Sequence, residues 1–184
     1  MMPAMTLDPA IGLLLVAAAA LLFASASAHK LRDLRRFEDI FTAYGVLPLL
    51  TRRHLSRVIP MLELGVAAGL LFDASRAHAV AVGTGLLLLY AGAIGINLRR
   101  GRRDLACGCG GPDDRRPIAP WMVWRNVLIA LALAFVLVPW SVRPLSLTDA
   151  VTVVFGLLTL ALIYLCIDQM MSYLHRAAQI RGWR

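Results

Sequence analysis

The sequence predicts an all-α integral membrane protein, built as a bundle of four to five transmembrane helices. The chain has 184 residues, of which 59% are hydrophobic, and its mean hydropathy is +0.70. A soluble domain of this length carries more charge and fewer unbroken apolar runs. Neither an internal repeat nor a low-complexity linker divides the chain. We therefore expect a single transmembrane bundle domain over residues 1–184.

Four apolar runs are long enough, or nearly long enough, to cross a hydrocarbon core that needs about 20 apolar residues. They are Ala10–Ala28, Ala79–Leu98, Ile118–Val138 and Leu147–Met171. A fifth run, Val58–Phe72, is shorter and contains Pro60 and Glu63. The first run ends in small residues as a signal peptide does, but its basic residues follow it instead of preceding it. We expect an uncleaved first span.

The net charge of +8 comes from basic residues that lie mainly at the ends of the apolar runs. Anchoring to lipid headgroups explains this placement, so we expect a lipid bilayer partner and no nucleic acid. Basic residues are absent before the first span, dense in Lys30–Arg57, sparse in the second connection and dense again in Arg99–Arg116. This alternation fits five spans with the N-terminus outside and the tail inside, and it puts the cysteine loop on the cytoplasmic side or at that interface. We expect a multi-pass protein of the inner (plasma) membrane.

The segment His29–Leu50 is more than a loop. Its apolar residues recur at helical spacing, with charged residues on the other side. The pattern predicts an amphipathic helix that lies in the membrane interface after the first span. Gly45 and Pro48 are expected to end it.

The connection before the fourth long run holds Cys107 and Cys109 on either side of Gly108. A disulfide across one residue is strained by ordinary bridge geometry, and glycine permits the unusual backbone it needs. A strained disulfide is easily reduced, which suits thiol–disulfide exchange. Neighbouring arginines, among them Arg99, Arg102 and Arg103, would favour the reactive thiolate. Two unpaired thiols in a glycine-rich turn stay open as the alternative, and no metal site is predicted, because the ligand set is incomplete for zinc.

Cys166 lies in the last apolar run. A cysteine in such a run is usually a small hydrophobic residue. The alternative is a resolving thiol that the Cys-Gly-Cys loop reaches.

Polar residues inside the apolar runs are costly, usually face the bundle interior and pair with one another. Glu63, Asn97, Arg125 and Asn126 are of this kind. We predict a pair of Glu63 with Arg125, with Lys30 as the competing partner. The pair either fixes helix packing or forms a polar floor beneath the thiols. His29 and Lys30 follow the first span and are expected to snorkel to the headgroups or to serve the site.

Five motifs together resemble the methylamine-utilisation protein MauE family. In chain order they are ASASAHKLRDLRRFE, VLP, PMLELGVAAGLL, AIGINLRRGRRDLACGCGG and WRNVLIALA. The resemblance runs from about Ala24 to about Ala134, and the block INLRRGRRDLACGC followed by RN is its specific part. The last span matches only in hydrophobicity. The matching motif positions are His29, Lys30, Glu63, Asn97, Arg99, Cys107, Cys109, Arg125 and Asn126.

The resemblance implies a small helical bundle related to DoxX-like membrane proteins. It also implies a role in the maturation or export of the methylamine dehydrogenase small subunit, beside a thioredoxin-like partner of the MauD type. That client is an exported protein, whereas the charge count puts the cysteine loop inside. Either the loop re-enters the bundle, or electrons are relayed across the membrane. Oxidation by a bound quinone would need the outer face alone, and the sequence does not choose.

The lead hypothesis is a thiol–disulfide oxidoreductase that acts through Cys107 and Cys109 on an exported client. The second is a non-catalytic assembly scaffold that recruits the partner to the membrane. The third is a small-solute transporter lined by Glu63, Asn97 and Arg125, but inverted repeats and paired broken helices are not evident.

Overall fold

The computed structural model describes residues 6–46, 49–108 and 117–181, and helices dominate throughout. The predicted all-α class is confirmed, since no strand occurs within these ranges. The contacts group the chain into two compact units, Met1–Ala18 with Val138–Arg184 and Ala19–Leu137. We describe each unit by itself, and the single-domain assignment stays a prediction.

Four of the described helical segments are long and apolar enough to cross a membrane, as predicted. They are α1 (Pro9–Arg32), α4 (Asp73–Arg99), α5 (Pro120–Ala134) with the short 3₁₀ helix η1 (Phe135–Leu137), and the Leu147–Met171 part of α6 (Leu147–Arg181). Each overlaps one of the four long apolar runs of the sequence. The chain is therefore a membrane protein.

The fifth apolar run, Val58–Phe72, lies largely within a helix that is longer than the run. Helix α3 (Leu49–Leu70) begins well before Val58 and includes a basic stretch, with Arg57 as its last member. It is not among the helices apolar enough to span a membrane. Pro60 lies inside α3, where its ring removes one backbone hydrogen bond of the helix.

The predicted amphipathic helix is α2 (Leu34–Ala43), which is shorter than the predicted segment because α1 continues to Arg32. Asp33 separates the two helices and accepts a hydrogen bond from the Arg36 backbone N–H at 3.1 Å, which caps α2. Gly45 follows the helix with a φ of +62°, a conformation that glycine adopts without steric cost, so it ends α2 as predicted. The position of α2 in the membrane interface stays a prediction.

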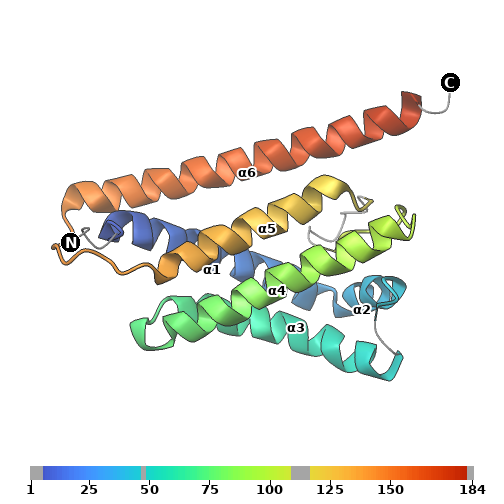
Figure 1. Cartoon of the computed structure of the whole chain (residues 1–184), viewed down its shortest axis with the longest axis horizontal. Helices are drawn as coiled ribbons and strands as arrows, with labels where there is room; N and C mark the ends of the chain where they lie inside the picture. The colour runs from blue at the N-terminus through green and yellow to red at the C-terminus, as the bar shows by residue number, and fades with distance from the viewer. Residues whose placement is uncertain (1–5, 47–48, 109–116, 182–184) are drawn as a thin grey trace, which may run out of the picture. The chain divides into compact units, whose positions relative to one another are not determined.

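In the larger unit, α4 packs against both α3 and α5, and α2 packs against α3 (Figure 1). At Gly83, helices approach α4 closely. A Cβ atom there would lie 3.0 Å from side-chain atoms of Leu133 and Val66 and 3.1 Å from the Phe23 ring. Helices α1, α3 and α5 thus converge on one small residue of α4, which is how membrane helices pack closely.

In the smaller unit, the segment before α6 pairs with the segment before α1. Leu7 exchanges two backbone hydrogen bonds of 2.8 Å, one to Pro139 and one from Ser141. The Trp140 ring lies against Gly12 of α1, where a Cβ atom would be 2.5 Å away. Most of the described side chains of α6 are exposed.

Candidate functional site

The Cys107 segment leaves the end of α4 through a tight turn. Gly101 has a φ of +74°, and the Arg102 backbone N–H donates back to the Asn97 carbonyl at 3.0 Å. The chain then forms a narrow neck, because the Ile118 N–H donates to the Leu105 carbonyl at 2.9 Å. A bridge between Ala106 and Pro117 completes the neck. Cys107 follows immediately.

Cys107 is disulfide-bonded, whereas Cys166 of α6 is a free and exposed thiol. Cys109, the predicted second member of the motif, lies outside the described residues. Cys166 belongs to the other compact unit, and its role as a resolving thiol stays a prediction. Gly108 has a φ of +69°, and a Cβ atom at this position would be 3.1 Å from the Ile40 side chain of α2. The segment therefore rests on α2.

The Tyr44 side chain contacts the segment that holds Cys107. Its hydroxyl donates to the Cys107 carbonyl at 3.4 Å, a long hydrogen bond. Its ring belongs to a buried cluster with Ile94, Ile118 and Met122, and Cys107 packs against that cluster. The cysteine is thus seated on side chains from α2, α4 and α5.

Arg102 fixes the end of α2 next to the end of α4. Its guanidinium donates to the Ala43 carbonyl at 2.7 Å, to the Tyr44 carbonyl at 3.4 Å and to the Asn97 side-chain oxygen at 3.2 Å. The last carbonyls of a helix have no partner within the helix, so a cation there satisfies them and opposes the helix dipole. Arg99, expected to act on the thiols, is exposed at the end of α4.

Burial raises the pKa of the Tyr44 phenol well above its ordinary value of 10.0, and the charge of Arg125 acts in the opposite direction. Tyr44 is therefore a neutral donor at physiological pH. The Arg125 guanidinium lies over the Trp121 ring, 5.0 Å from its centroid, as in a cation–π contact. The positive charge of Arg125 thus acts on Tyr44, the residue that contacts Cys107.

A second polar cluster ties α1, α3 and α4 together. Lys30 and Tyr90 both donate to Oε1 of Glu63, the tyrosine at 2.7 Å. The Lys30 ammonium also lies 4.7 Å from the Tyr90 ring centroid and 5.2 Å from that of Phe37. Lys30 and Glu63 are buried in this cluster. Among the described residues, Oε2 of Glu63 has no hydrogen-bond partner.

The predicted pair of Glu63 with Arg125 is wrong, and the competing partner, Lys30, is correct. One turn before this pair, the Ser27 hydroxyl donates to the Pro60 carbonyl at 2.8 Å. This buried contact fixes α1 against α3 and brings Lys30 next to Glu63. The expectation that Lys30 snorkels to the headgroups is wrong for the same reason.

Asn97, Asn126 and His29 do not take part in the hydrogen bonds of the Lys30–Glu63–Tyr90 cluster. Asn97 and Asn126 are buried, and each side-chain amide donates to the carbonyl four residues earlier in its own helix. His29 is half-buried, and its Nδ1 has no hydrogen-bond partner among the described residues.

Sequence reasoning missed three residues: Tyr90, Tyr44 as a cysteine contact, and Arg102 as a clamp. Tyr90 carried a signal, because it is a lone hydroxyl in the run LLLLYAGAIG. Tyr44 continues the helical spacing of apolar residues in His29–Leu50, which indicates packing and not a contact with a cysteine. The role of Arg102 depends on the turn at Gly101, which brings its side chain back to α2.

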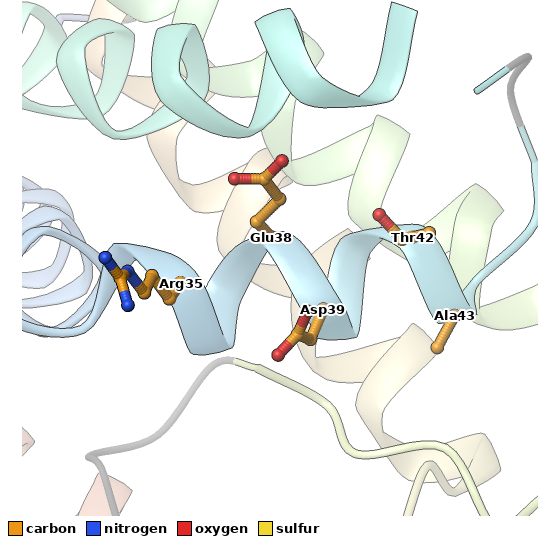
Figure 2. Close-up of a pocket in the computed structure, with 5 residues that line it drawn as sticks. All are labelled: Arg35, Glu38, Asp39, Thr42 and Ala43. Carbon is orange, nitrogen blue, oxygen red and sulfur yellow. The ribbon is translucent and has the colours of Figure 1, made fainter. Parts of the chain in front are cut away.

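A shallow hollow runs along the polar side of α2. Its lining residues are Arg35, Glu38, Asp39, Thr42 and Ala43 (Figure 2). The Glu38 and Asp39 carboxylates point in different directions (Figure 2). The hollow contains none of the predicted site residues, and we assign no ligand to it.

Comparison with known proteins finds one family. The family model described as "Methylamine utilisation protein MauE" matches residues 8–139, a range that ends before α6. Three similar proteins carry the name methylamine utilization protein MauE. The protein of Paracoccus denitrificans is 38% identical over 147 residues, 79% of each chain.

The other two relatives cover different shares of the chain. The protein of Methylophilus methylotrophus is 33% identical over 174 residues, 94% of this chain and 92% of its own. The protein of Paracoccus versutus is 34% identical over 134 residues, 72% of each chain. No solved structure matches.

Proposed function

Because the chain belongs to the family of methylamine utilisation protein MauE, we propose that it serves methylamine utilisation as a membrane maturation factor. It carries out thiol–disulfide exchange through Cys107 and Cys109 on behalf of an exported protein. The observation that carries this proposal is the disulfide at Cys107, seated on Tyr44 at the end of α2. A cysteine that merely filled space would need no bond partner.

In the proposed exchange, a disulfide bond passes from one pair of cysteines to another. A thiolate of a partner dithiol attacks a sulfur of the loop disulfide, the loop S–S bond breaks and a mixed disulfide forms. The second partner thiol then displaces the loop cysteine. Two electrons and two protons have moved, so the partner is a disulfide and the loop a dithiol. The reverse exchange with another disulfide returns the loop to its first state.

The partner proposed from the family resemblance is a thioredoxin-like protein of the MauD type. The client is an exported protein, the methylamine dehydrogenase small subunit. Four membrane-spanning helices support a location in the inner (plasma) membrane, where both are within reach. In this proposal the Lys30–Glu63–Tyr90 cluster holds the helices that carry the loop, and Arg125 and Asn126 complete the polar interior.

The test replaces each cysteine singly. Cys107→Ser and Cys109→Ser are expected to abolish client maturation while the protein still accumulates in the membrane. Cys166→Ala is the control, because its thiol is free, and it should retain maturation. Client abundance and its disulfide content are measured in cells, and a mixed disulfide with the thioredoxin-like partner is trapped by acid quenching. Full maturation in both serine variants would refute the exchange.

A second function is favoured by one observation, the hydrogen-bonded cluster that joins three helices. In a scaffold, this cluster would matter and the cysteines would not. Loss of maturation in Tyr90→Phe, with full maturation in Cys107→Ser, would select the scaffold. The reverse result would select the exchange.

A further inference from the structure

We propose that Tyr44, held in place by Arg102, is a positioning residue that favours the disulfide form of the Cys107 loop over its dithiol form. This inference rests on the proposed exchange function and adds regulation from outside the Cys-Gly-Cys motif. The two residues lie on different segments, yet both act on the end of α2.

The first step of the argument is that the end of α2 is fixed. Arg102 donates to the Ala43 and Tyr44 carbonyls and to the Asn97 side chain. Asn97 is itself buried, and its amide nitrogen donates to the Ala93 carbonyl at 3.0 Å. One guanidinium therefore connects a rigid position of α4 to the backbone of Tyr44. The backbone at Tyr44 cannot move away from the end of α4 without breaking these hydrogen bonds, and the burial of the Tyr44 ring among Ile94, Ile118 and Met122 holds the side chain.

The second step is that the fixed end of α2 contacts the oxidised segment at two successive residues. The Tyr44 hydroxyl donates to the Cys107 carbonyl at 3.4 Å, and Gly108 lies against Ile40 one turn earlier in α2. Cys107 also packs against the cluster of Tyr44, Ile94, Ile118 and Met122. These contacts belong to a Cys107 that is disulfide-bonded.

The third step is thermodynamic linkage. Reduction by a dithiol opens the loop S–S bond to two thiols, and the reductant becomes a disulfide. The opened segment has more conformational freedom, so contacts made by the closed form stabilise that form selectively. The Tyr44–Cys107 hydrogen bond is long, so its loss is expected to change this equilibrium by about two-fold, the low end for a protein hydrogen bond. For a two-electron couple, two-fold corresponds to about 9 mV in reduction potential.

The experiment uses the full chain in membrane vesicles, in a Cys166→Ala background that leaves only the motif cysteines. Vesicles are equilibrated in dithiothreitol buffers of graded redox ratio, quenched with acid and alkylated with a large maleimide. The fraction of dithiol is then read from the gel shift. Tyr44→Phe is expected to shift the equilibrium about two-fold toward the dithiol, and Arg102→Met is expected to shift it in the same direction.

Two matched controls separate positioning from general effects. Tyr173→Phe removes the hydroxyl of an exposed tyrosine in α6, which belongs to the other compact unit. Arg100→Met removes a positive charge from an exposed residue that lies two positions before Arg102 in the chain. Both controls should keep the wild-type equilibrium.

A wild-type equilibrium in Tyr44→Phe, or an equal shift in either control, would overturn the proposal. If Tyr44→Phe does not accumulate in the membrane, Arg102→Met compared with Arg100→Met decides by the same criterion. Client maturation in Cys107→Ser is measured in parallel. Normal maturation with a shifted equilibrium rejects the exchange function alone, whereas lost maturation with an unshifted equilibrium rejects the positioning role alone.

Discussion

Two ion-pair clusters, one in each compact unit, join segments that are far apart in the sequence, and they differ in exposure. In the larger unit, the Lys30 and Glu63 side chains are 7% and 1% exposed. In the smaller unit, Arg143 bridges Asp8 before α1 and Asp149 in the first turn of α6. The Arg143 and Asp8 side chains are 38% and 39% exposed.

The difference in exposure changes what each cluster does. Removing one member of a buried pair leaves a charge without water or a counterion, and this costs far more than the pair contributes by itself. An exposed pair exchanges protein contacts for hydration at little cost, and salt screens it. The Lys30 cluster therefore couples the stability of α1, α3 and α4. Arg143 only joins the start of α6 to the segment before α1.

The largest expected effect follows from breaking the buried pair. Lys30→Met leaves Glu63 with the Tyr90 hydroxyl as its one described donor, and we expect a loss of about 3 kcal/mol in the free energy of unfolding. Thermal unfolding of the purified protein in detergent measures it. The double variant Lys30→Met/Glu63→Leu should recover most of the loss. If the single and double variants were equally unstable, the buried charge would not be the cause.

An intermediate effect tests whether the helices around the buried cluster are closely packed. Gly83→Ala would push a methyl group to 3.0 Å from Leu133 and Val66, and we expect a loss of about 1–3 kcal/mol from overpacking. Gly85→Ala is the matched control, since no atom lies within 4 Å of a Cβ there. The same unfolding measurement applies, and equal results for the two variants would contradict close packing at Gly83.

The smallest effect concerns the exposed cluster and depends on pH. Hydrogen bonds from Arg143 lower the pKa of Asp8 below its ordinary value of 3.8. A lowered carboxyl pKa stabilises the folded state above that ordinary value, and the contribution disappears as the pH falls through the folded-state pKa. Arg143 lowers the pKa of Asp149 in the same way. Arg143→Met should therefore be slightly less stable than wild type at neutral pH, and the difference should shrink as falling pH protonates these two carboxylates. A difference that did not shrink in acid would assign Arg143 a role beyond Asp8 and Asp149.

The fold was largely predictable because its signals are local. Apolar length identified the four spans, helical spacing identified α2, and Gly45 ended it. The pairing of Glu63 was not predictable, because Lys30 and Arg125 are equally suitable cations in the sequence. The choice depends on how α1 crosses α3, which the Ser27–Pro60 contact fixes in three dimensions.

The candidate site, like the fold, was predictable only in part. The Cys-Gly-Cys spacing pointed to Cys107, which is disulfide-bonded, and to Cys109, which lies outside the described residues; their role in exchange stays a prediction. The supporting residues could not be ranked, because six arginines surround the motif and the sequence treats them alike. Only the turn at Gly101 separates Arg102, which reaches the carbonyls of α2, from Arg99, which is exposed.

The length of α6 has a consequence for whatever follows it. Its 35 residues would extend over about 52 Å at 1.5 Å per residue, whereas the hydrocarbon core is about 30 Å thick. The apolar part ends at Met171, and the helix continues to Arg181. About 15 Å of helix therefore extends beyond the apolar part. We expect this part to act as a stiff spacer that would hold a reporter fused to the C-terminus away from the hydrocarbon core.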